Sequence, residues 1–296
     1  MTRWHAWRGP LWILLFCFMM GIVASCVRWL SADMPVTQVV FWRNFAALLA
    51  MLPWAAPTWH YTKTIRVRIH AYRSLCGVMA MLLWFYTIAK LPMADAVVIS
   101  FTTPMFATLA AVLFLGEVVR WHRWAAIGFG FVGVLIIINP QGPHLLPWLG
   151  VVSGLASAVL GAISITLIKH LSSQHPPVLM LSLIAAFMAM FSMPLLLLGL
   201  QTPSLYQIGL IALMGVTAQI GQYGVIRAFE TMESSEASPL DFFRLPFAAA
   251  FGYIFFDEVV SPTTWVGAAV IFLSNLYIIR REHKRKRTQG APVVKM

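Results

Sequence analysis

The chain contains ten apolar runs, each about twenty residues long, which is the length that a helix needs to cross the hydrocarbon core of a bilayer. The runs are continuous rather than alternating. Hydrocarbon offers no partners for backbone N–H and C=O groups, so spanning segments of this kind must be helices. We therefore predict an all-α integral membrane protein with ten transmembrane helices. The predicted spans are 10–31, 35–55, 71–90, 93–115, 122–139, 146–169, 177–199, 204–226, 234–256 and 262–280.

The composition argues against a soluble fold. Of the 296 residues, 60% are hydrophobic and only 10% are charged, which is too few charges to cover a water-facing surface. The formal net charge of +11 would suggest a nucleic-acid partner in a soluble protein. Here the basic residues gather in short loops and in the tail after residue 279, as the positive-inside bias requires. We expect a lipid bilayer and no nucleic acid as partner, and a multi-pass protein of the bacterial inner membrane with both termini cytoplasmic.

The chain shows no catalytic or metal-binding pattern. Cys17, Cys26 and Cys76 are widely spaced inside apolar runs and have neither metal-ligand spacing nor the spacing of a disulfide framework. The histidines are scattered, and no H-E-x-x-H, G-x-S-x-G or phosphate-binding loop occurs. We expect no metal, no cofactor and no catalytic residue, and we do not expect an enzyme.

An internal repeat appears when residues 84–138 are laid over 225–279 at a constant shift of 141. The matches include Glu117-Val118-Val119 with Glu258-Val259-Val260, Phe101 with Phe242, and Trp124 with Trp265. Each half supplies five helices, an odd number, so the second half must enter the membrane from the opposite side. We predict two inverted five-helix repeats, 1–142 and 143–282, and a basic cytoplasmic tail, 283–296. Inverted repeats place a binding site near the midplane, between the halves.

Several features of the repeat are shared with a known family. Each copy has an alanine-rich helix around a proline, an acidic residue closing that helix, and a further helix that in the first copy is rich in glycine. The second span also contains Phe41-Trp42-Arg43-Asn44-Phe45. In these features the chain resembles the EamA-type repeats of the drug/metabolite transporter superfamily. The resemblance implies ten helices, a central cavity lined by the first four helices of each half, and transport of metabolites such as amino acids, vitamins or nucleotide derivatives.

Charged residues inside the spans are the first candidates for a binding site, because a charge in hydrocarbon is costly unless it faces a cavity or a partner. Arg43 lies near the middle of the second span, and it either contacts the substrate or anchors helix-end carbonyls. Asp241 and Arg244 share a face of the ninth span, either as a self-satisfied ion pair or as part of the site. A protonatable Asp241 offers a route to proton coupling. Arg28 lies near the outer end of the first span, where snorkelling explains it.

Other polar and aromatic residues complete the candidate site. The repeat shift sets Ser100 and Thr103 opposite Asp241 and Arg244, so one half presents hydroxyls where the other presents charges. Three residues of the eighth span, Gln219, Gln222 and Tyr223, share one helical face because they are spaced three and four positions apart. They either bond neighbouring helices together or donate hydrogen bonds to a ligand. The remaining candidates are Gln38, Trp42, Asn44, Trp84 and Tyr86, and the aromatic residues among them either stack on a planar ligand or pack against other helices.

Pro104 and Pro246 interrupt helices in corresponding places of the two halves. Paired interruptions point to a midplane binding site, although a plain kink compensated by serine or threonine is the alternative. We predict a secondary transporter that moves a small polar or amphipathic metabolite by alternating access. An amino-acid derivative, a vitamin or a nucleoside-containing cofactor would suit the candidate residues. The competing hypotheses are an integral-membrane enzyme acting on an amphiphilic substrate and a passive channel.

Overall fold

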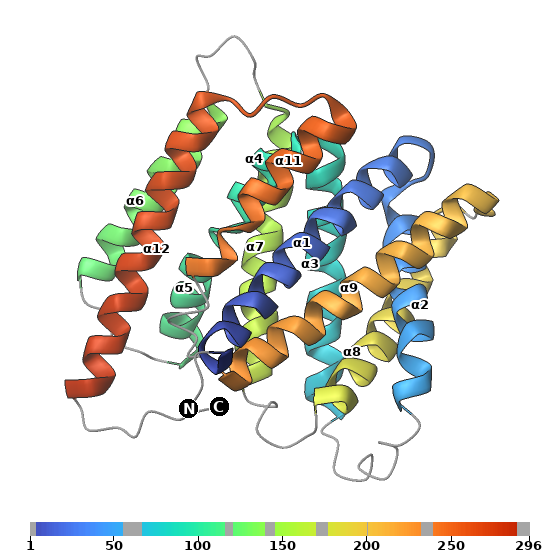
Figure 1. The fold of residues 1–296 in the computed structure, drawn as a ribbon, viewed down its shortest axis with the longest axis horizontal. Coiled ribbons are helices and arrows are strands. Elements are labelled where there is room, and N and C mark those ends of the chain that lie inside the picture. The colour runs from blue at the N-terminus through green and yellow to red at the C-terminus, as the bar shows by residue number, and fades with distance from the viewer. Residues whose placement is uncertain are drawn as a thin grey trace.

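A computed structural model describes residues 4–55, 67–115, 121–139, 146–169, 177–199, 201–231 and 239–288. The described residues fold into helices joined by short connections, with no β-strand among them, which confirms the all-α prediction (Figure 1). The helices are α1 (Trp4–Asp33), α2 (Val36–Ala55), α3 (Val67–Lys90), α4 (Met93–Ser100), α5 (Thr103–Leu115), α6 (Trp121–Ile138), α7 (Trp148–Lys169), α8 (Pro177–Ser192), the 3₁₀ helix η2 (Met193–Leu198), α9 (Leu205–Thr231), α11 (Arg244–Phe256) and α12 (Pro262–Thr288).

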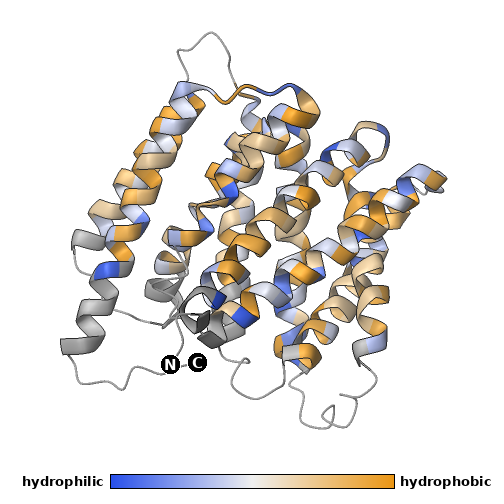
Figure 2. Cartoon of the chain, in the orientation of Figure 1, coloured by the Kyte–Doolittle hydropathy of each residue, from blue (hydrophilic) through white to orange (hydrophobic). Residues whose placement is uncertain are grey.

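Ten spans result when α4 with α5 and α8 with η2 each count as one, and this agrees with the predicted number. Among the described residues, five helices are long and apolar enough to cross a membrane alone, and four shorter apolar helices accompany them. Apolar residues cover the helices along most of their length (Figure 2). Large side chains such as Phe129, Leu197 and Leu205 point outward with more than half of their surface exposed. Lipid is the solvent that suits such a surface.

Some boundaries differ from the predicted ones. Helix α9 continues past the predicted end at 226 to Thr231, and α12 continues to Thr288, so that residues 283–288 of the predicted tail are helical. The beginning of the predicted ninth span falls on 234–238, outside the described residues, and α11 itself begins only at Arg244. Polar residues make up the α12 extension, which can be helical because a helix satisfies its own backbone hydrogen bonds.

Helices from the first part of the sequence pack against helices from the second part. Helix α1 packs mainly on α9, α3 on α7, and α2 on both α8 and α9. Helices α6 and α12 form a separate pair at one edge of the molecule (Figure 1). Their backbones touch at two glycines: a Cβ on Gly133 would lie 2.9 Å from the Gly267 carbonyl oxygen, and one on Gly267 would lie 2.6 Å from that of Gly133. Small residues permit this close approach, which is the usual basis of helix contact in membranes.

The fourth and ninth spans are each interrupted by a tight turn. At the first break, between α4 and α5, the Phe101 and Thr102 amides donate to the carbonyls three residues earlier, at 3.1 Å each. At the second break, just before α11, the Phe243 amide donates in the same way to Leu240, at 3.0 Å. Pro104 and Pro246 lie in the first turn of the helix that follows each break, where a missing N–H is tolerated.

The two ends of the bundle differ in how tightly they pack. We call the end where α1 stops and α2 starts the Asp33 end. There, residues 23–27 of α1 and 93–99 of α4 are buried without exception. In the opposite part of α1, between residues 11 and 20, only Ile13 and Cys17 are buried. The half of α1 toward the Asp33 end is therefore packed more densely than the opposite half.

Candidate functional site

The first break satisfies its backbone with donors from the protein itself. Pro104 has no N–H to offer the Ser100 carbonyl, and the Thr103 hydroxyl donates to that carbonyl instead, at 2.7 Å. The Asn275 side-chain amide of α12 donates to the buried Phe101 carbonyl at 2.8 Å. Breaks in transmembrane helices persist where such partners replace the lost ladder bonds. This break is thus neutral, and side chains supply donors to its Ser100 and Phe101 carbonyls.

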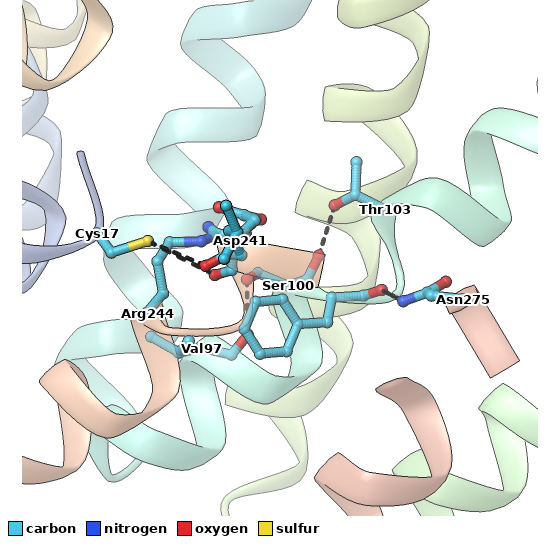
Figure 3. Close-up of polar contacts among 9 residues, drawn as sticks. Cys17, Val97, Ser100, Thr103, Asp241, Arg244 and Asn275 are labelled. Carbon is cyan, nitrogen blue, oxygen red and sulfur yellow. Dashed lines mark hydrogen bonds and ion pairs between the residues drawn. The ribbon is translucent and has the colours of Figure 1, made fainter. Parts of the chain in front are cut away.

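The second break carries charges. Asp241 and Arg244, on either side of the turn, form an ion pair with a direct hydrogen bond (Figure 3). Their side chains remain 32% and 21% exposed, so water or a ligand can reach them. The Arg244 guanidinium carbon lies 5.0 Å from the centre of the Phe101 ring. The Cys17 sulfur of α1 lies 3.7 Å from the Leu240 carbonyl oxygen, and a thiol is a weak donor.

The two breaks meet in space. The rings of Phe101 and Phe242, which occupy matching positions of the internal repeat, have their centres 4.2 Å apart. Phe272 of α12 packs edge-on against Phe242 at 4.6 Å. A partly exposed guanidinium beside an aromatic platform can bind a carboxylate or phosphate through paired hydrogen bonds while a planar group stacks nearby. The paired breaks are therefore the candidate binding site.

The candidate residues of α2 form a second polar group. Arg43 donates to the Asn44 side-chain oxygen at 3.0 Å, and Gln38 accepts from the Gln201 backbone amide at 3.2 Å. Asn44 and Gln38 are fully buried. Among the described residues, four buried side-chain N–H groups on this helix have no acceptor. They are Gln38 Nε2, Trp42 Nε1, Arg43 Nε and Asn44 Nδ2.

The polar residues of α9 do not form one group. Gln219 is buried and donates to the Ala47 carbonyl of α2 at 3.2 Å. Tyr223 instead accepts from Arg227 at 2.8 Å and packs edge-on against Trp12 of α1. Gln222 is exposed. The residues share a helical face in projection, but each meets a different neighbour along the helix. Gln219 thus links α9 to α2 through this hydrogen bond.

Four further candidates have local partners. The Ser100 hydroxyl donates to the Val97 carbonyl at 2.6 Å, and Thr103 donates to Ser100 as described above. Their hydroxyl protons are thus engaged, and only the oxygens remain as acceptors. Trp84 packs against the buried core, and the Lys90 ammonium lies 5.9 Å from the centre of the Tyr86 ring.

Sequence reasoning missed several partners. Asn275 and Cys17 contact the breaks, although the sequence assigned them no role. The polar pair Ser274-Asn275 within an apolar run was the available signal for the former. The snorkelling interpretation of Arg28 was wrong, because its guanidinium pairs with Glu258 at 2.6 Å. Glu117, the matching acid of the first half, lies outside the described residues.

Comparison with known proteins decides the family. Residues 7–139 and 148–280 each match the EamA-like transporter family. The chain belongs to this family. The two matches begin and end at the same shift of 141 that the internal repeat shows. This EamA-like protein is a transporter of small metabolites. Its apolar helices agree with a multi-pass inner-membrane protein. The family is the one that the sequence features resembled.

Curated bacterial relatives are similar over nearly the whole chain. A riboflavin transporter of Rhizobium johnstonii is 27% identical over 94% of this chain and 93% of its own length. An S-adenosylmethionine uptake transporter of Rickettsia bellii is 28% identical over 90% of this chain and 93% of its own length. The pseudopaline exporter CntI of Pseudomonas aeruginosa is 26% identical, with 92% of this chain and 96% of its own length covered. These names include both uptake and export.

A protein of known crystal structure shares the fold. It superimposes on this EamA-like chain with a TM-score of 0.60, over 95% of this chain and 99% of the other, at 14% sequence identity. At this identity the likeness concerns the fold alone.

Proposed function

We propose that this EamA-like protein is a secondary transporter working by alternating access, with residues 1–142 and 143–282 as two inverted halves around one binding site. The observation that carries the proposal is the contact between the two interrupted spans at Phe101 and Phe242, with the Asp241–Arg244 pair beside it. Interrupted helices in matching places of two halves are the usual frame of a transport site.

The packing supports an approximate twofold relation between the halves. A shift of 141 turns the contact of α1 with α9 into the contact of α7 with α3, and both are among the most extensive in the bundle. It also turns the contact of Gly133 with Gly267 into that of Ser274 with Ala126, and the Ser274 hydroxyl does donate to the Ala126 carbonyl. Contacts that exchange partners under one shift are those expected of inverted repeats.

The charge distribution supports the orientation. With both termini cytoplasmic, the loops assigned inside carry most of the loop arginines and lysines, and the Asp33 end faces outward. The denser packing at the Asp33 end then corresponds to a state that is closed to the outside.

The cargo that we propose is an amphipathic metabolite with an anionic, acceptor-rich group and a planar ring. The four partnerless N–H groups on α2 and the Arg244 Nε are all donors, and buried donors without acceptors are costly unless a ligand or water supplies one. The aromatic pair at the breaks offers a stacking surface for a ring. S-adenosylmethionine, the cargo named for one relative, combines a planar ring with a carboxylate, whereas riboflavin, named for another, has a planar ring and polar but uncharged groups.

Flux into liposomes tests the proposal. The purified protein should accumulate riboflavin or S-adenosylmethionine in a saturable manner, and the recovered cargo should be chemically unchanged. Arg244→Ala should abolish the flux while the protein stays folded, and Arg68→Ala, at an exposed arginine of α3, is the matched control. Normal flux in Arg244→Ala would remove this residue from the mechanism. A modified product would indicate the enzyme alternative, and flux without saturation would indicate a channel.

If neither cargo moves, a thermal-shift screen of other metabolites on the detergent-solubilised protein identifies the cargo to test next. A ligand that binds the folded state raises its melting temperature. The proposal predicts that anionic, ring-containing metabolites give the largest shifts, and that Arg244→Ala reduces those shifts.

A further inference from the structure

An ion pair joins the two halves at the Asp33 end, away from the breaks. The Arg28 guanidinium of α1 pairs with the Glu258 carboxylate at 2.6 Å, just after α11. The same guanidinium donates to the Leu91 carbonyl at 2.6 Å and to the Ile88 carbonyl at 3.3 Å. These carbonyls lie at the C-terminal end of α3, where they lack helical partners and attract cations. Arg28 therefore binds α1 to α3, and both of these helices belong to the first half.

The second oxygen of Glu258 binds the first half directly. It accepts from the Met93 backbone amide of α4 at 2.7 Å. This N–H lies in the first turn of α4, where amides lack helical acceptors and a carboxylate is favourable. One carboxylate from the second half thus holds both the guanidinium of α1 and the start of α4. The side chains of Arg28 and Glu258 are only 25% and 15% exposed, so water screens them weakly.

The backbone around Glu258 is shaped for this contact. Asp257 adopts a left-handed conformation at φ 54°, and the Glu258 amide donates back to the Gly252 carbonyl at 3.0 Å. Gly252 leaves room for the carboxylate, because a Cβ there would lie 3.0 Å from the Glu258 Oε2 atom. The left-handed turn at Asp257 and the lack of a side chain at Gly252 together direct the Glu258 carboxylate toward the start of α4. A second tie between the halves lies nearby, where the Thr264 hydroxyl of α12 donates to buried Asp95 of α4.

We propose that Arg28 and Glu258 form a gate at the Asp33 end of this transporter. The bonds of Arg28 to α3 stay within one half and survive a rocking motion. The bonds of Glu258 cross between the halves, so both must break before the Asp33 end opens. The gate rests on the proposed alternating-access function, and it adds two residues that stabilise the closed state at this end beside the Thr264–Asp95 bond.

Distance measurement tests the gate independently of the cargo. The full-length protein, with its three cysteines replaced by alanine, carries spin labels at Asp33→Cys and Val259→Cys, which are exposed positions of the first and second halves. Pulsed electron paramagnetic resonance in lipid nanodiscs then reports their separation. We expect one dominant short distance in the otherwise unchanged protein. Glu258→Gln and Arg28→Gln should each raise the ratio of long to short distances about tenfold or more, because each removes the ion pair between the halves and leaves its partner charge poorly exposed to water.

A matched control removes a neighbouring charge without touching the gate. Asp257→Asn keeps a residue that tolerates the left-handed conformation, and it should leave the distances unchanged. The Arg28→Gln and Glu258→Gln double variant should shift the ratio by less than the product of the single effects, because the two residues share one interaction.

Distances in Glu258→Gln and Arg28→Gln that match those of Asp257→Asn would overturn the gate. Either variant suffices for this result if the other does not fold. The binding site is tested separately by the flux of Arg244→Ala, so the gate and the site can each fail while the other stands.

Discussion

The two interrupted spans solve the same backbone problem with different chemistry. The first break closes its freed carbonyls with the Thr103 hydroxyl and the Asn275 amide, both strong neutral donors. The second break has only the weak Cys17 thiol beside its carbonyls, and it carries the Asp241–Arg244 ion pair instead. Under the repeat shift, Ser100 and Thr103 occupy the positions of these two charges.

This difference suggests a division of labour between the halves. The neutral break offers a surface for packing, because the Ser100 and Thr103 hydroxyl protons and the Asn275 amide already donate to carbonyls. A partly exposed ion pair can exchange its internal bond for a bond to cargo, because guanidinium and carboxylate groups both bind ligands strongly. We therefore expect the second half to recognise the charged part of the cargo and the first half to supply the surface on which it packs.

The largest expected effect compares the charges with their hydroxyl counterparts. Asp241→Asn and Arg244→Lys should each weaken cargo binding about 10- to 100-fold, since a hydrogen bond to a charged group is worth about 1.5–3 kcal/mol. Ser100→Ala and Thr103→Val, the matched changes in the first half, should alter binding by less than about threefold. Titration of the purified variants with the transported cargo measures both pairs. Equal losses in the two halves would show that the asymmetry has no role in recognition.

A smaller effect is expected where the two halves meet at α6 and α12. Gly133→Leu should destabilise the protein by about 1–3 kcal/mol, because its new side chain would meet the backbone of α12. Gly128→Leu on the same helix should be close to neutral, since no atom lies within 4 Å of a Cβ there. Unfolding in a denaturing detergent gives both free energies. If both variants are equally stable, the glycine contact does not hold this helix pair together.

The smallest effect compares the donors at the two breaks. Asn275→Leu should lower the free energy of unfolding by about 0.6–1.7 kcal/mol, the range of interhelical hydrogen bonds in membranes. Cys17→Ala should cost only a few tenths of a kcal/mol beyond its lost volume, because a thiol is a weak donor. The same unfolding titration compares the two. A larger loss from Cys17→Ala would reverse the proposed contrast between a bonded and a weakly bonded break.

Much of the framework could be predicted from the sequence, and the individual partners could not. The number of spans, the repeat and the paired prolines follow from run length and from matching residues. The face of α9 that carries Gln219, Gln222 and Tyr223 was also predictable from spacing, but the separate neighbours of Gln219 and Tyr223 were not. Helical spacing gives directions around one axis and contains no information on which helix lies in each direction.

The sequence by itself determined the spans of this protein, because bilayer thickness and the need for internal backbone bonds leave few lengths and only one conformation for apolar runs. Only the tertiary structure decided which residues meet. Glu258 and the Met93 amide are 165 positions apart, and Asn275 and Phe101 are 174 apart. Such contacts depend on the rotation and register of packed helices, which small residues and side-chain shape set collectively.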